Sequence, residues 1–171
     1  MKIIKYRFPF IYFVVFSLSI FIGYSADSVG INNNLINYYD FIGDILNFTA
    51  ILTGFIGAII SILTSISKSS PIITSILKSK KALSQFVSSM AIPFTTGFIT
   101  IFLSMVLRLK INNPELFLSF RYINVALLSL AIFFVVTSFL MTFFVFYIFF
   151  LDGFSNKNQK EKKVFKPTLK K

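Results

Sequence analysis

Four long runs without a charged residue dominate the sequence. They cover residues 8–26, 45–67, 82–107 and 122–151. A helix needs about 20 apolar residues to cross the hydrocarbon core of a bilayer, and each run reaches or nearly reaches that length. The longest run exceeds it, so its helix is expected to tilt or to extend into the headgroups. The pattern predicts an all-α integral membrane protein with four transmembrane helices.

The remaining segments are too short to form a second domain. The tail at residues 152–171 is the longest of them, and chains below about 40 residues seldom fold alone. Only 13% of the residues are charged, against about 25% in soluble domains, so the chain cannot cover a globular surface with charge. We therefore expect a single membrane domain over residues 1–171, with its helices in an antiparallel bundle.

Lysine and arginine in the connections predict the orientation, because cytoplasmic connections carry an excess of both. With both termini in the cytoplasm, the cytoplasmic segments hold 14 of these residues and the outer segments hold 3. The expected location is a bacterial cytoplasmic (inner) membrane. The first run also has features of a signal peptide, with Gly23 and Ser25 as small residues before a cleavage site, but its many aromatic residues favour a retained helix.

Small residues recur along the second run at helical spacing. Ala50, Gly54 and Ala58 form one row, and Gly57, Ser61 and Ser65 form the next. Small residues let helix backbones approach closely, which matters in lipid because no hydrophobic force drives helices together there. These rows predict a helix-packing face. The preferred interpretation is packing within the same chain, and the alternative is a dimer interface.

The third run carries a similar face with a proline in it. Ser89, Pro93 and Gly97 form one row, and Thr96, Thr100 and Ser104 form another. Proline removes a backbone donor and clashes with the carbonyl four residues earlier, which predicts a kink near Ser89 and Pro93. We expect neighbouring hydroxyls and helices to satisfy the freed groups. The alternative is a polar path or an ion site along the two rows.

The fourth run is rich in phenylalanine and poor in small residues, which predicts the most lipid-exposed helix of the four. The connection at residues 67–81 predicts a short amphipathic helix instead. Ser70 is placed to cap it, Pro71 suits its first turn, and lysines gather at its end, where they favour an anionic membrane surface.

Groups for catalysis are scarce. The chain has no cysteine and no histidine, and none of its six acidic residues lies deep in a run. Asp40 and Asp44 form an acidic pair at the outer end of the second run, which we interpret as a boundary feature and as the first acids to test for an outer ion or partner. We expect no enzyme activity, no cofactor and no metal site.

The basic part of the tail, residues 155–171, contains seven lysines and a single aromatic residue, Phe165. Lysines near an anionic leaflet contribute about 1 kcal/mol each, so the tail is expected to bind anionic lipid headgroups. Nucleic-acid binding is not expected, because the tail offers no aromatic platform for bases.

Three functions are compatible with these features. The first is a non-catalytic protein that acts through helix contacts with another membrane protein, or with itself, as an accessory subunit, inhibitor or immunity factor. In size, four spans and inward termini, the chain is similar to immunity proteins against pore-forming bacteriocins of the colicin A type; that resemblance covers architecture and no motif. The second is an oligomeric pore or membrane-disrupting effector of the lysis or phage-defence type. The third is a small uncoupled carrier.

Overall fold

The computed structural model describes residues 7–32, 35–66, 70–113 and 119–164. Within these ranges all regular structure is helical and no strand occurs. The helices are α1 (Arg7–Val29), α2 (Tyr38–Ile66), α3 (Pro71–Lys78), α4 (Lys80–Asn112) and α5 (Phe120–Val164). All but α3 contain a segment long and apolar enough to cross a membrane. The prediction of an all-α fold with four long apolar helices is confirmed over this part of the chain.

The helices extend beyond the uncharged runs at most of their ends. Each predicted span lies inside one long helix, apart from position 67, which falls outside the described residues. The largest extension is at the end of α5, which continues through much of the lysine-rich tail as far as Val164. Backbone hydrogen bonding does not stop where the apolar run ends, so helix length and span length differ.

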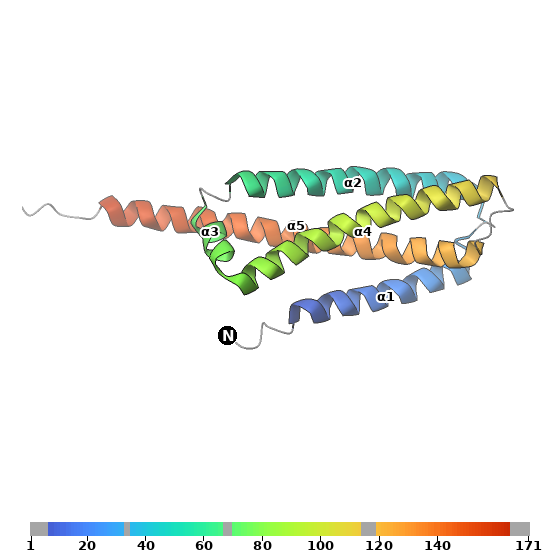
Figure 1. The fold of residues 1–171 in the computed structure, drawn as a ribbon, viewed down its shortest axis with the longest axis horizontal. Coiled ribbons are helices and arrows are strands. Elements are labelled where there is room, and N and C mark those ends of the chain that lie inside the picture. The colour runs from blue at the N-terminus through green and yellow to red at the C-terminus, as the bar shows by residue number, and fades with distance from the viewer. Residues whose placement is uncertain (1–6, 33–34, 67–69, 114–118, 165–171) are drawn as a thin grey trace, which may run out of the picture.

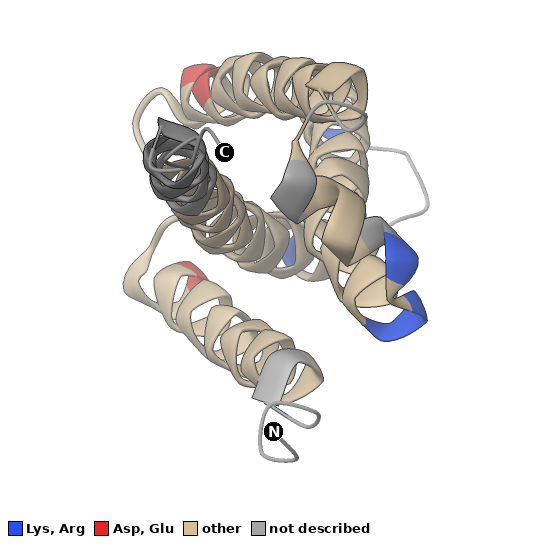
Figure 2. Cartoon of the chain, turned by 90° about the vertical axis from the view of Figure 1, so that its left-hand side faces the viewer, with Lys and Arg blue, Asp and Glu red and all other residues tan. Residues whose placement is uncertain are grey.

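The long helices alternate in direction, and α4 and α5 lie at the centre of the arrangement (Figure 1). Helix α4 packs against α2 on one side and against α5 on the other, whereas α1 packs mainly against α5. Figure 2 looks along the helices and shows α1 standing apart from α2 and α4. The arrangement is therefore a core of α2, α4 and α5 with α1 attached to the outer side of α5.

Helix α5 is the most buried of the four long helices, which corrects the expectation that it is the most exposed. In its most apolar segment 39% of the residues are buried, against 11% in α1. Its buried side chains recur at helical spacing and include Leu127, Phe134 and Met141, each fully enclosed. Bulky side chains fill the space between helices as well as small ones do, so a lack of small residues does not signal exposure.

Two glycines mark the places where helices approach most closely. A methyl group built on Gly23 of α1 would lie 2.8 Å from the backbone nitrogen of Ser129 in α5. One built on Gly97 of α4 would lie 2.8 Å from the ring of Phe134 and would also overlap the hydroxyl of Thr53 in α2. A side chain at Gly23 would have to displace the backbone of α5, and a side chain at Gly97 would have to displace the side chains of Phe134 and Thr53.

The short amphipathic helix is confirmed as α3. The side chain of Ser70 accepts a hydrogen bond of 3.2 Å from the backbone N–H of Ile73, and Pro71 occupies the first turn. Ile73 is buried against the core of the bundle, beside Leu63 and Phe86. Ser79 ends α3 and also caps α4, so the two helices meet at a single residue.

Candidate functional site

The ends of three helices meet in one buried polar network. Asp27 lies in the last turn of α1, Tyr38 begins α2, and Asn124 lies near the start of α5. All three side chains are buried, and that of Asn124 is fully enclosed. The network lies beside an apolar cluster that includes Ile42 and Leu107. It is therefore a buried polar site packed against an apolar cluster.

Asn124 is the centre of this network. Its side-chain N–H groups donate to the carboxylate of Asp27, at 2.7 Å, and to the backbone carbonyl of Ile31, at 2.9 Å. Its side-chain oxygen accepts from the hydroxyl of Tyr38. The Asn124 amide thus uses both of its donor hydrogens and its acceptor oxygen. The three partners lie in α1, in the connection after α1 and in α2. A buried polar group without a partner costs about 1–3 kcal/mol, so this full set of bonds fixes the three elements to one another.

An ion pair completes the network. The guanidinium Nε of Arg121 lies 3.3 Å from the second carboxylate oxygen of Asp27. Each charge sits at the helix end that disfavours it, because a negative charge is unfavourable at a helix C-terminus and a positive charge at an N-terminus. The pair neutralises both. Arg121 is 61% exposed, whereas Asp27 is only 6% exposed, so water screens this pair from the side of the arginine.

The backbone after α1 is shaped to reach Asn124. Gly30 has a left-handed φ of 106°, which glycine adopts without strain. Its N–H donates to the carbonyl of Asp27, and the N–H of Ile31 donates to the carbonyl of Ala26, the pair of bonds that ends a helix in a Schellman motif. This turn ends α1 and brings the carbonyl of Ile31 to the Asn124 amide.

A small polar hollow of about 280 Å³ adjoins the ion pair. Its lining residues are Asp27, Ser28, Asn32, Phe120 and Arg121. The single carboxylate here is already engaged by an amide and a guanidinium, so the arrangement binds helix ends together. Among the described residues, no group of three or more His, Cys, Asp or Glu side chains is placed to hold a metal ion.

The rows of small residues on α2 lie on its outer side. Ala50, Gly54, Ala58, Ser61 and Ser65 are exposed, and Gly57 is half-buried. Gly54 has no atom of another helix within 4 Å of a built methyl group. A methyl group built on Gly57 would lie 3.5 Å from the ring of Phe94 in α4, so this part of the face meets the same chain. Packing of the rest of the face against another chain stays a prediction.

The physical reason for this exposure is that α4, not α2, supplies the glycine at their crossing. Helix α2 meets α4 and α5 through the opposite face, on which Thr49, Thr53 and Ile56 are buried. Thr53 lies against Gly97 of α4. One small residue at a crossing is enough for close approach, so the small residues of α2 were not needed there.

The two predicted rows of α4 lie in the interior of the bundle. Ser89, Pro93, Gly97, Thr100 and Ser104 are buried, and Thr96 is half-buried. The hydroxyls of Thr96, Thr100 and Ser104 donate to carbonyls of their own helix at 2.8–2.9 Å. Helix α4 is continuous through Pro93, and the kink stays a prediction.

The predicted acidic pair is not part of the network. Asp40 and Asp44 are both exposed in the first turns of α2. Beside them, the guanidinium of Arg108 lies over the ring of Tyr39, with its central carbon 4.1 Å from the ring centre. The pair thus borders the site, and Asp27 is the buried acid.

Sequence reasoning missed Asp27, Tyr38 and Asn124 as a group. Asn124 is the only residue with an amide or charged side chain in the run at 122–151. An amide within an apolar run needs hydrogen-bond partners inside the protein, and this signal could have pointed to the site. Asp27 directly follows the first run. The pairing of the two is set by the antiparallel contact of α1 with α5, which neither position reveals alone.

Four packed helices of this length and apolarity indicate a multi-pass membrane protein. No protein-family model, curated protein or solved structure matches the chain significantly. The role within that class therefore has to be inferred from the chain's own surfaces.

Proposed function

We propose that this chain is a non-catalytic protein of a bacterial cytoplasmic membrane that acts through helix–helix contacts with another membrane protein. The small-residue face of α2, formed by Ala50, Gly54, Gly57, Ala58, Ser61 and Ser65, is the contact surface. The role is that of an accessory, inhibitory or immunity-type protein. Both termini lie in the cytoplasm, and the lysine-rich tail binds anionic headgroups.

The observation that carries this proposal is the exposure of the α2 face. Gly54 leaves the backbone of α2 open, with nothing within 4 Å of a built methyl group. Exposed large side chains, among them Ile51, Phe55 and Ile62, border the face on one side. A strip of small residues beside bulky ones forms a shallow depression that another transmembrane helix can enter. At Gly57 the face meets Phe94 of α4, and around Gly54 the chain's own helices leave it open.

The competing functions have less support. A pore or carrier path along α4 needs hydroxyls that face water, but Thr100 and Ser104 are fully enclosed and bond to their own helix. A coupled transporter or an intramembrane enzyme usually relies on embedded carboxylates or histidines, and the uncharged runs inside the four helices carry neither.

Photo-cross-linking in living cells tests the proposal. A benzophenone amino acid placed at Ala58, on the face, should give a discrete adduct whose mass identifies a membrane partner. The matched control carries the same group at Phe55, which is 54% exposed on the bordering bulky side of α2. We expect a strong adduct at Ala58 and little at Phe55. Adducts of equal yield at both positions, or none at either, would contradict the proposal, and an adduct of twice the chain's mass would make the partner a second copy.

The same face can be blocked without disturbing the fold. Gly54→Leu adds bulk where no neighbouring helix is present, so the bundle should fold as before while the Ala58 adduct disappears. An Ala58 adduct that survives Gly54→Leu would place the contact elsewhere on the helix.

A further inference from the structure

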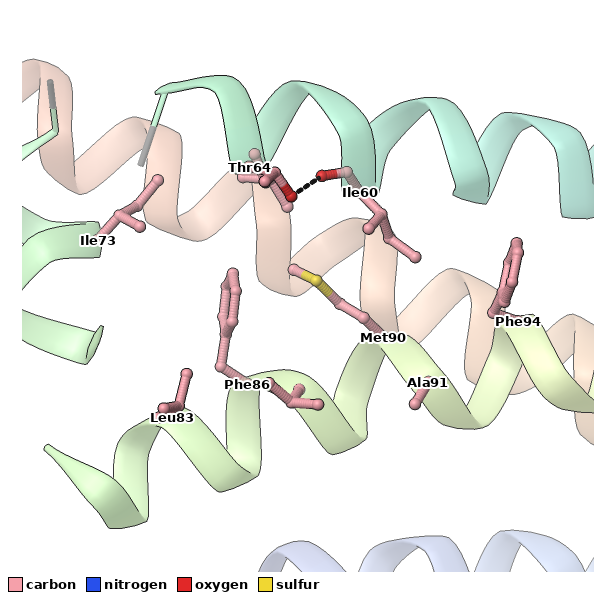
Figure 3. A pocket seen from close by; sticks show the side chains of 10 residues that line it. Ile60, Thr64, Ile73, Leu83, Phe86, Met90, Ala91 and Phe94 are labelled. Carbon is pink, nitrogen blue, oxygen red and sulfur yellow. Dashed lines mark hydrogen bonds between the residues drawn. The ribbon is translucent and has the colours of Figure 1, made fainter. Parts of the chain in front are cut away.

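An apolar groove opens between α2, α3 and α4 at the end of the bundle where α3 lies (Figure 3). It holds about 450 Å³. Ile60 and Thr64 extend into it from α2, Phe86 and Met90 from α4, and Ile73 closes the end formed by α3. The inner wall is tightly packed, whereas Val87 on the outer wall is 53% exposed. The groove is therefore accessible from the side of the bundle.

The interior of the groove offers nothing to a polar ligand. Thr64 is the only lining residue with a hydrogen-bonding side chain, and its hydroxyl donates to the carbonyl of Ile60 at 2.8 Å. Any occupant of the groove itself must therefore be apolar.

Three lysines stand at one end of the groove. Lys78 ends α3, and Lys80 and Lys81 begin α4 just before the lining residue Leu83. All three are exposed, and Figure 2 shows the positive residues at the start of α4 on the end of the bundle that faces the viewer. The sequence has no acidic residue between Asp44 and Glu115, so no carboxylate of α3 or α4 neutralises them.

The length of the groove matches one leaflet. On α4 its lining runs from Leu83 to Phe94, which is about 17 Å at 1.5 Å per residue. Half of a hydrocarbon core of about 30 Å is close to that value. A transmembrane helix of a partner would be longer than the groove by about the thickness of one leaflet. The acyl chain of a phospholipid spans one leaflet and so matches the length of the groove.

We propose that this groove binds one anionic phospholipid. An acyl chain lies between α2 and α4, and the phosphate meets Lys78, Lys80 and Lys81 at the membrane surface. The lipid holds the end of α4 against α2, where the chain's own side chains leave the space open. This site requires that the chain resides in a membrane, but it does not depend on a partner at the α2 face.

Native mass spectrometry of the full chain tests the proposal. Protein purified in mild detergent is mixed with phosphatidylglycerol or with phosphatidylcholine of the same acyl chains, and the retained lipid is counted. We expect one phosphatidylglycerol to be retained preferentially. Replacing all three lysines with glutamine should lower that preference at least about fivefold, which corresponds to about 1 kcal/mol, the contribution of one lysine near an anionic surface.

Two controls locate the lipid. The substitutions Lys157→Gln, Lys160→Gln and Lys162→Gln remove the same charge from the tail and should lower the preference much less than the three substitutions at the groove. Ala91→Phe fills the groove and should remove the retained lipid, whereas Ala58→Phe, on the exposed side of α2, should not. Equal retention of both lipids, equal loss with the tail substitutions, or full retention in Ala91→Phe would each overturn the proposal. If Ala91→Phe fails to fold, the lysine substitutions still decide it, because they alter exposed side chains only.

Discussion

At the scale of single residues, one amide holds three helix ends together. Asn124 bonds to the carboxylate of Asp27, the carbonyl of Ile31 and the hydroxyl of Tyr38. These groups are buried and bond to the amide, so the loss of the amide removes a partner from several of them at once. The network is thus expected to be the least replaceable polar feature of the chain.

Replacing Asn124 with leucine tests this expectation. The leucine fills a similar volume but satisfies none of the three groups, so the free energy of unfolding in detergent should fall by at least about 2 kcal/mol. Thermal unfolding followed by circular dichroism measures the change. Tyr122→Leu, at a neighbouring position that is 78% exposed, is the control and should leave the midpoint nearly unchanged. Equal midpoints for the two variants would show that the network contributes no net stability.

The sequence alone could indicate that Asn124 needs a partner, but not which one. The carboxylate of Asp27 and the amide lie 97 positions apart, and they meet only because α1 packs on α5. The sequence does not show which helices pack together, so it could not predict this contact. Ser70 and Pro71 were predictable for the opposite reason, since a helix cap is a contact between residues three positions apart.

At the scale of helices, the residue pattern of the sequence predicted the positions of the long helices well. It predicted less well which faces of these helices pack against one another. The four long apolar helices follow from local composition, and the structure has them. The expectation that α5 is the most exposed helix was wrong, and the small-residue face of α2 is mostly exposed. A helix has several faces that can be buried, and the shape of the neighbouring helices decides among them. Gly97 and Thr53 fit at the crossing of α4 with α2, and Gly54 of α2 is left without a neighbour.

Two alanine substitutions separate a packed glycine from a free one. Gly97→Ala forces a methyl group against Phe134 and Thr53, so we expect a loss of about 1–3 kcal/mol from overpacking. Gly54→Ala meets no neighbour and should be neutral or should stabilise the helix by up to about 1 kcal/mol, since alanine favours a helix more than glycine does. Unfolding of both variants in the same detergent measures the difference. A larger loss for Gly54→Ala would mean that the α2 face is buried within the chain after all.

At the scale of the whole molecule, the two ends of the bundle differ in chemistry. One end carries the Asp27 network, and the other carries α3 with the lysines at the start of α4 (Figures 1 and 2). Both proposed contact sites, the α2 face and the lipid groove, need the bundle to stand across a bilayer. The excess of lysine at the α3 end supports our proposal that this end faces the cytoplasm.

Cysteine labelling tests this central claim directly, because the chain has no cysteine of its own. Ile36→Cys places one thiol in the connection between α1 and α2, at a position 88% exposed, and Ser75→Cys places one on the exposed side of α3. A membrane-impermeant maleimide added to intact spheroplasts should label the Ile36→Cys protein at once and the Ser75→Cys protein only after lysis. Labelling in the reverse order, or of both proteins before lysis, would contradict the proposed insertion.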